Sequence, residues 1–86
     1  MMAAVRNYVY VLGASDRDGS RTYVGWTNDL ARRLALHNSG RGARSTRGRH
    51  WVLLHVEAFP TRREAMSREQ RLKRDCALRA ALRADL

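Results

Sequence analysis

Two short runs of β-branched and aromatic residues, separated by a turn signal, constrain the fold of this chain more than any other feature. Residues 8–12 (YVYVL) and 22–26 (TYVGW) both predict β-strands. Asp18-Gly19, between them, is a typical turn sequence. We therefore predict a β-hairpin, in which alternate side chains face the same side of the sheet.

A helix is predicted after the hairpin, ending near Asn38 and just before Ser39-Gly40. Thr27 or Asn28 can act as its N-cap. Its apolar stripe is predicted to consist of four aliphatic residues, namely Leu30, Ala31, Leu34 and Ala35. We expect this stripe to face the sheet.

The second half of the chain predicts a strand and two further helices. Residues 51–59 are apolar on both alternating faces, which is typical of a central strand covered on both sides. Thr61 and Glu64 form a capping box for a helix that continues to about Arg74. Asp75 can cap a last helix, whose inward-facing residues are predicted to be Leu78, Ala81 and Leu82.

The predicted order of elements is β-β-α-β-α-α, without repeats or a linker. This order predicts an α/β fold, a small three-stranded antiparallel sheet flanked by helices. We expect one domain over residues 1–86, with its core at about residues 7–74.

The charge balance is strongly basic. The chain has 17 Lys and Arg against 8 Asp and Glu, a net charge of +9, and Lys73 is its one lysine. A high-GC genome would explain arginine in place of lysine, but it would not explain the excess of positive charge. A domain of this kind is expected to bind a polyanion, most often nucleic acid.

Four of the arginines lie in a predicted loop over residues 40–50. No acidic residue occurs between Asp29 and Glu57, so these arginines have no acidic partner nearby in the sequence. A solvated loop is the ordinary alternative to a surface that faces phosphates. The residues predicted to bind nucleic acid are Arg32, Arg41, Arg44, Arg47, Arg49 and Lys73.

Glu69 occupies an unusual position in the helix predicted from the capping box. On a helical projection of about 100° per residue, Glu69 falls inside the apolar arc of Ala65, Met66 and Leu72. A buried carboxylate costs several kcal/mol unless it is paired or binds a metal. Glu69 therefore has either a structural partner or a functional role.

Four further residues are predicted to face the same side of the sheet as Glu69. Arg33 and His37 are neighbours at i, i+4 on the first helix, and Tyr10 and Tyr23 lie on the hairpin. Each has an ordinary explanation alone: a surface arginine, a core histidine and packed tyrosines. Together they suit phosphodiester hydrolysis, with Mg²⁺ or Mn²⁺ on the carboxylate and Arg33 on the phosphate. A tyrosine acting as base would need cations that lower its pKa, and we expect the arginines to supply them.

These residues resemble the GIY-YIG nuclease domain. YVY at 8–10 stands where that family has its first motif, and YVG at 23–25 is close to its second. Arg33, His37 and Glu69 follow at the family's spacing. The resemblance covers about residues 7 to 73, and the small stand-alone bacterial GIY-YIG proteins are the most similar group.

The resemblance implies a metal-dependent endonuclease, as in homing endonucleases and nucleotide-excision repair nucleases, which favours DNA over RNA as the partner. By resemblance, Tyr10 and Tyr23 line the site and one of them helps to activate water. Arg33 would bind the scissile phosphate, and His37 would assist proton transfer or phosphate positioning. Glu69 would hold the divalent metal, Mg²⁺ or Mn²⁺. The identity of the general base stays open.

Two other functions are consistent with the sequence. One is a nucleic-acid-binding module of the same fold with little or no catalysis, and the other is an RNA-associated structural protein. Cys76 is the single cysteine, which excludes an intramolecular disulfide and fits a reducing cytoplasm. Residues 1–13 are too short for a membrane span and predict no targeting signal.

Overall fold

A computed structural model describes residues 6–84 and residue 86. The prediction for the N-terminus falls partly on residues 1–5, which lie outside the described residues. The predicted β-β-α-β-α-α order is confirmed, with one added turn of 3-10 helix. The elements are β1 (Asn7–Asp16), β2 (Gly19–Thr27), α1 (Leu30–Asn38), the 3-10 helix η1 (Arg44–Thr46), β3 (Val52–Phe59), α2 (Arg62–Arg74) and α3 (Cys76–Arg83).

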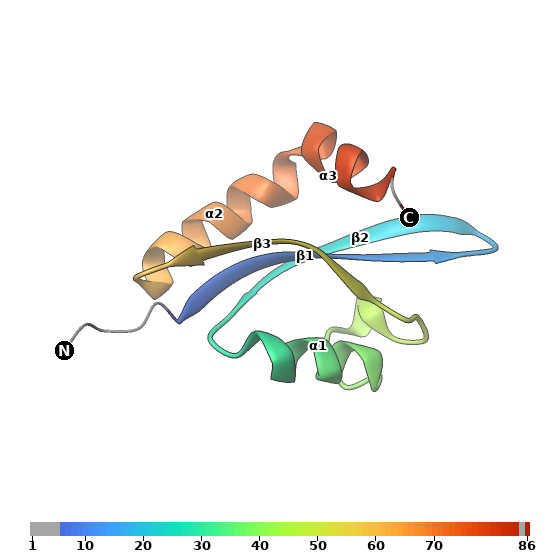
Figure 1. Cartoon of the computed structure of the whole chain (residues 1–86), viewed down its shortest axis with the longest axis horizontal. Coiled ribbons are helices and arrows are strands. Elements are labelled where there is room, and N and C mark those ends of the chain that lie inside the picture. The colour runs from blue at the N-terminus through green and yellow to red at the C-terminus, as the bar shows by residue number, and fades with distance from the viewer. Residues whose placement is uncertain (1–5, 85) are drawn as a thin grey trace.

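The three strands form one antiparallel sheet in the order β2-β1-β3. Figure 1 shows α1 on one side of this sheet and α2 and α3 on the other. The predicted α/β class and its three-stranded sheet are therefore confirmed.

The predicted hairpin is present and longer than expected. β1 pairs with β2 in a continuous register that ends at the pair of Asp16 and Gly19. Arg17 and Asp18 form the connecting turn, and the Asp18 amide donates a hydrogen bond of 2.9 Å to the Asp16 side chain. Gly19 has a φ of 114°, a conformation that glycine adopts without strain.

β1 is the central strand, and both of its faces are buried. Val9 and Val11 belong to a cluster with residues of α2, whereas Tyr10 and Leu12 belong to a second cluster that contacts α1. Because neighbouring β1 side chains point to opposite faces, one strand supplies the apolar centre of both layers. The second cluster is the one that carries the candidate site.

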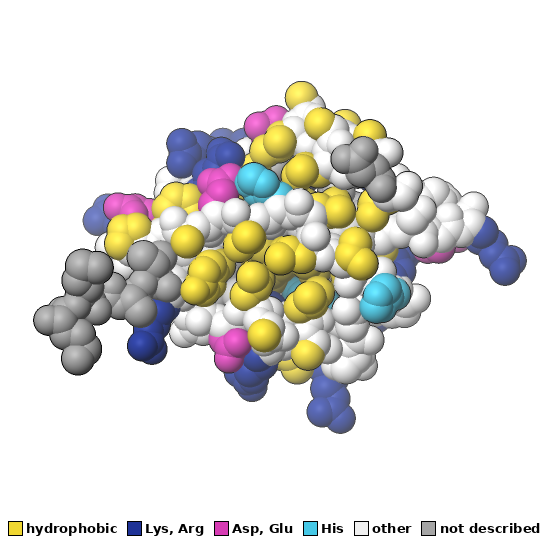
Figure 2. All heavy atoms as spheres, viewed as in Figure 1, with side chains coloured by type: hydrophobic (Ala, Val, Ile, Leu, Met, Phe, Trp, Pro, Cys, Tyr) yellow, Lys and Arg dark blue, Asp and Glu magenta, His cyan; other side chains and the backbone are white. Residues whose placement is uncertain are grey.

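The prediction that residues 51–59 form the central strand was wrong, because β3 lies at the edge of the sheet. Three of its apolar residues, Val52, Leu53 and Val56, are exposed. In the hairpin, β1 pairs with β2 along one edge, and β3 pairs with the other edge of β1. No described strand pairs with the outer edge of β3. In Figure 2, hydrophobic side chains gather in the middle of the face in view, and Lys and Arg side chains lie mostly toward its rim.

The first helix begins one or two residues later than its predicted caps imply. Asp29, not Thr27 or Asn28, is its N-cap, and the Asp29 side chain accepts from the Arg32 amide at 3.2 Å. Thr27 instead accepts from the Asp29 amide in the preceding turn. The predicted stripe was partly wrong as well. Leu30 and Leu34 pack inward, whereas the shorter side chains Ala31 and Ala35 are exposed.

The predicted limits of the last two helices are confirmed. Thr61 caps α2 by accepting from the Glu64 amide, and Asp75 ends α2 and caps α3 by accepting from the Leu78 amide. Two inward-facing predictions were wrong: Met66 and Ala81 are exposed, because the buried arc of each helix is narrower than the sequence suggests. None of the described helices combines the length and apolarity needed to cross a membrane.

Candidate active site

The centre of the candidate site is a buried contact between Tyr10 on β1 and His37 on α1. The Tyr10 side-chain oxygen lies 3.0 Å from Nε2 of His37. Tyr10 is 2% exposed and His37 is 1% exposed. The histidine thus combines the buried position that the helix pattern predicted with a polar partner from the sheet.

Tyr23 on β2 completes an aromatic group with these two residues. The ring centroids of Tyr23 and His37 are 4.8 Å apart, and those of Tyr23 and Tyr10 are 6.4 Å apart. Gly25 lies opposite Tyr10 in the hairpin. A Cβ atom at Gly25 would lie 2.5 Å from the Tyr10 hydroxyl and 3.2 Å from the Tyr23 ring. The glycine of the YVG motif therefore leaves the space that the Tyr10 side chain occupies.

The loop after α1 holds the other side of His37. Oγ1 of Thr46, which is 0% exposed, lies 2.9 Å from Nδ1 of His37. The Trp51 indole nitrogen donates to the Thr46 carbonyl at 2.8 Å, and Trp51 also exchanges two hydrogen bonds with Asn38. These bonds tie the loop to the end of α1 and the start of β3.

The sequence interpretation assigned no role to Thr46, Trp51 or Gly42. Thr46 stands between Arg44 and Arg47, so it was treated as part of a basic loop. A Cβ atom at Gly42 would overlap the His37 ring and lie 2.9 Å from its Cα, so this glycine lets the loop close over the histidine. The spacing from His37 to a hydroxyl residue nine positions later is a weak signal, because long-range side-chain pairing has no local pattern.

Arg33 lies on the exposed surface of α1 and acts electrostatically on the aromatic group. Burial, helped by the nearby Tyr23, raises the pKa of Tyr10 to about 12 against the opposing effect of Arg33. Burial also raises the pKa of Tyr23, and the nearby Arg33 cation opposes this effect. Arg33 is a cation of the kind that a basic tyrosine needs, but desolvation outweighs it, so neither tyrosine has a lowered pKa.

His37 is also held in its neutral form. Burial lowers its pKa below the ordinary value, and the neighbouring Arg33 cation lowers it further. Tyr10 and His37 are therefore a neutral phenol and a neutral imidazole in direct contact at pH 7.

Glu69 is mostly buried, as its position in the apolar arc predicted, with 14% of its side chain exposed. Among the described residues its one ion-pair partner is Lys73, whose Nζ lies 3.8 Å from Oε1 and whose side chain is 49% exposed. The Glu69 charge contributes to the raised pKa values of Tyr10 and Tyr23. The prediction that all five residues face one side of the sheet was wrong, because α2 packs on the face of the sheet opposite α1. The Glu69 charge nevertheless reaches the two tyrosines, and its one described ion pair is long.

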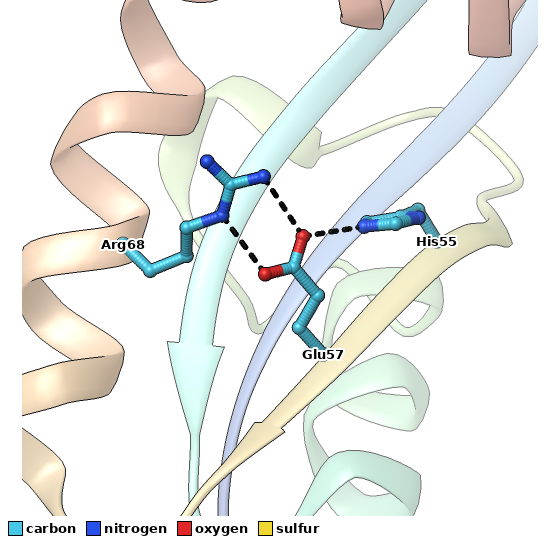
Figure 3. Close-up of polar contacts among 3 residues, drawn as sticks. All are labelled: His55, Glu57 and Arg68. Atoms are coloured by element: carbon cyan, nitrogen blue, oxygen red, sulfur yellow. Dashed lines mark hydrogen bonds and ion pairs between the residues drawn. The ribbon is translucent and has the colours of Figure 1, made fainter.

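The helix that carries Glu69 is anchored to the sheet by the preceding residue, Arg68 (Figure 3). Arg68 donates two hydrogen bonds to Glu57 on β3, at 2.8 and 3.0 Å, and His55 lies 2.7 Å from the same carboxylate. These contacts, led by the Arg68 hydrogen bond, lower the pKa of Glu57 to about 2. The ion pair ties α2 to β3 at the residue next to Glu69.

The donor set suits a divalent ion held by few protein atoms. Within the described residues there is no group of three or more His, Cys, Asp and Glu side chains that could hold a metal. Mg²⁺ commonly binds through one or two carboxylates and completes its shell with water and substrate phosphate. A mostly buried carboxylate whose cation partner is largely exposed, as at Glu69, fits that kind of site.

The residues predicted to bind nucleic acid differ in their surroundings. Arg32, Arg41, Arg44 and Arg47 are exposed. Arg49, in contrast, forms an ion pair with Asp16 at 3.3 Å, so it has an acidic partner that is distant in the sequence. Lys73 is engaged with Glu69. The loop therefore presents three exposed arginines, and its fourth, Arg49, is ion-paired with the hairpin.

A polar cleft of about 270 Å³ lies at the start of α1. Arg33 belongs to its lining, whereas Tyr10 and Tyr23 do not. The other residues of its lining are Trp26, Thr27, Asn28, Asp29, Arg32 and Leu36.

Fold and site together define a small α/β domain with tyrosine, histidine, arginine and glutamate side chains around one sheet. Residues 6–78 match the family described as the GIY-YIG catalytic domain. The chain belongs to this family, as its sequence resemblance implied.

Similar relatives bear the name UPF0213 protein. One from Streptococcus pneumoniae serotype 4 is 53% identical over 68 residues, which cover 78% of this chain and 66% of the relative. One from Clostridium perfringens is 48% identical, covering 79% of this chain and 71% of the relative. One from Halobacterium salinarum is also 48% identical, with shares of 78% and 84%. The match thus spans about two thirds of the first relative's length, and no solved structure matches this chain.

Proposed function

We propose that this chain is a metal-dependent endonuclease that hydrolyses phosphodiester bonds in nucleic acid, with DNA as the favoured substrate. Membership of the GIY-YIG family supports the reaction class. The observation that carries the proposal is the 3.0 Å contact between the Tyr10 oxygen and His37 Nε2, beside the weakly neutralised Glu69. Such a pair can accept and pass on a proton, and a purely structural pair would not need the nearby carboxylate.

The proposed base is the hydrogen-bonded pair, not a free phenolate. Burial raises the pKa of Tyr10 to about 12, so at pH 7 its oxygen is a poor base while it keeps its own proton. As the attacking water gives a proton to the Tyr10 oxygen, the phenol proton passes to Nε2 of His37. The water O–H bond breaks and its proton ends on the imidazole. As the new P–O bond forms, the scissile P–O bond breaks, and the leaving oxygen takes a proton from solvent water.

The remaining residues act on the phosphate. Arg33 is exposed and cationic beside the tyrosines, so it can bind the scissile phosphate and stabilise charge that develops there. Glu69 would hold the divalent ion, which would polarise the phosphoryl oxygen and stabilise the leaving oxygen. The exposed arginines of the loop, Arg41, Arg44 and Arg47, would contact neighbouring phosphates and give affinity without sequence readout.

The test is a cleavage assay on labelled single-stranded, duplex, nicked and branched DNA and RNA, with Mg²⁺, Mn²⁺ or EDTA. Wild type is compared with Glu69→Gln and with Glu64→Gln, which changes an exposed carboxylate on the same helix. We expect metal-dependent cleavage by wild type and Glu64→Gln and none by Glu69→Gln, with equal binding by all three. Binding without cleavage on every substrate would instead support the nucleic-acid-binding module.

A further inference from the structure

We propose that Thr46 is a positioning residue that fixes the tautomer of His37, so that Nε2 is free to receive the proton of Tyr10. The proposal rests on the proposed function for its consequence in catalysis. The structural part concerns only which ring nitrogen carries hydrogen, and it is decided by the hydrogen bonds around Thr46.

The direction of each hydrogen bond follows from the Thr46 hydroxyl. Its oxygen lies 2.7 Å from the carbonyl oxygen of Ala43. A carbonyl oxygen cannot donate, so the hydroxyl hydrogen must lie in this contact. A hydroxyl has one hydrogen, and Thr46 can therefore only accept in its second contact, at 2.9 Å from Nδ1 of His37.

His37 accordingly carries its hydrogen on Nδ1. In a neutral imidazole the other nitrogen is then an acceptor. The Tyr10 hydroxyl lies 3.0 Å from that nitrogen and donates to it. With the opposite tautomer, which predominates in free histidine, Nε2 would donate to the Tyr10 oxygen and could not take a second proton.

The surrounding structure holds Thr46 in this geometry. Thr46 is 0% exposed, so water does not compete for its hydroxyl. The Thr46 amide also donates to the Ala43 carbonyl at 3.0 Å, and the Trp51 indole binds the Thr46 carbonyl. Gly42 leaves room for the loop to approach the His37 ring. After proton transfer, Nδ1–H still has its acceptor, so the loop also stabilises the imidazolium.

The tautomer can be read directly from the imidazole ¹⁵N and ¹H chemical shifts of labelled protein at about pH 8, above the ordinary histidine pKa. The His37 signals are assigned by their loss in His37→Gln. In wild type we expect a protonated Nδ1 and an unprotonated Nε2. Thr46→Val removes the acceptor at similar volume and should shift the equilibrium toward Nε2–H, whereas Thr46→Ser should keep the wild-type pattern.

Single-turnover cleavage supplies the second measurement. Thr46→Val should cleave at least about tenfold more slowly than wild type, since a wrong tautomer costs up to about 10⁴-fold in other enzymes, and Thr46→Ser should restore most of the rate. A wild-type His37 with hydrogen on Nε2 would overturn the proposal even if Thr46→Val fails to fold. An unchanged tautomer in folded Thr46→Val would overturn it as well. The tautomer is measured without substrate, so loss of the nuclease proposal leaves this result unaffected.

Discussion

The Tyr10 side-chain oxygen lies 3.0 Å from Nε2 of His37, although 27 positions separate the two residues in the chain. β1 supplies the tyrosine and α1 the histidine, so the contact forms only when the helix packs on the sheet. Both residues are buried and both stay neutral at pH 7. This pair links the fold to the proposed chemistry.

Gly25→Ala should disturb Tyr10 directly. The new methyl group would lie 2.5 Å from the Tyr10 hydroxyl and 2.7 Å from its ring carbon, so we expect a loss of roughly 1–3 kcal/mol in unfolding free energy. Urea unfolding of Gly25→Ala, Tyr10→Phe and the double variant tests the cause. Tyr10→Phe should cost less in the Gly25→Ala background than in wild type, because the removed hydroxyl was part of the clash. If the losses of unfolding free energy in the two single variants simply add in the double variant, the loss in Gly25→Ala does not come from the clash with the Tyr10 hydroxyl.

The cleavage rate should depend on the protonation of His37. Protonation of Nε2 blocks proton transfer, so activity requires the neutral ring and declines as the pH falls through the His37 pKa. Burial and Arg33 place that pKa below the ordinary 6.5, so the pH at which the rate has fallen by half should lie below 6.5. Single-turnover rates across pH test this. The control is His50→Gln, which should show the same decline in rate at low pH. A rate that is already half lost at or above pH 6.5 would argue against His37 as the proton acceptor.

The ion pair of Glu57 and Arg68 should contribute pH-dependent stability. The pKa of Glu57 is about 2 in the folded protein against 4.5 ordinarily, so its contribution is present above about pH 4.5 and is lost as the pH falls toward 2. Glu57→Gln should lower the unfolding free energy by roughly 1–2 kcal/mol at pH 7, a moderate value because the pair is partly exposed. At pH 3 the difference should be clearly smaller. Urea unfolding at both pH values, with Glu64→Gln as the control, measures it.

The exposed loop arginines should contribute to the salt dependence of binding. Arg44→Ala and Arg47→Ala should each lower the slope of log affinity against log salt by about 1. Arg49→Ala should have a smaller effect, because Arg49 is already paired with Asp16. The control is Arg83→Ala on α3, which removes equal charge on the side of the sheet opposite α1 (Figure 1). An equal slope change in that control would remove the loop from the proposed interface.

Local patterns in the sequence predicted most of the fold. Thr61 and Asp75 cap helices as predicted, and the two runs around Asp18-Gly19 form the hairpin. The prediction failed for β3, whose apolar residues suggested a buried strand. Apolarity on both faces does not determine the order of strands, and the free edge of β1 decided it.

The site was predictable to a different extent. Helical spacing indicated that Glu69 is mostly buried and that His37 faces the sheet, and both are confirmed. Thr46 was missed because its bond to His37 depends on how a glycine-containing loop folds back. The raised pKa of Tyr10 had no signal in the sequence, because burial outweighs Arg33 and burial is a property of the packed structure.

The most direct test of the account is the single-turnover cleavage rate of Tyr10→Phe at saturating protein and metal. This variant keeps the buried ring, removes the hydroxyl that contacts His37 and should cost only about 1 kcal/mol of stability. If the pair is the base, the rate should fall by about 10²–10⁴-fold while nucleic-acid affinity and folding stay close to wild type. A rate within about threefold of wild type, in a folded variant that binds normally, would contradict the account.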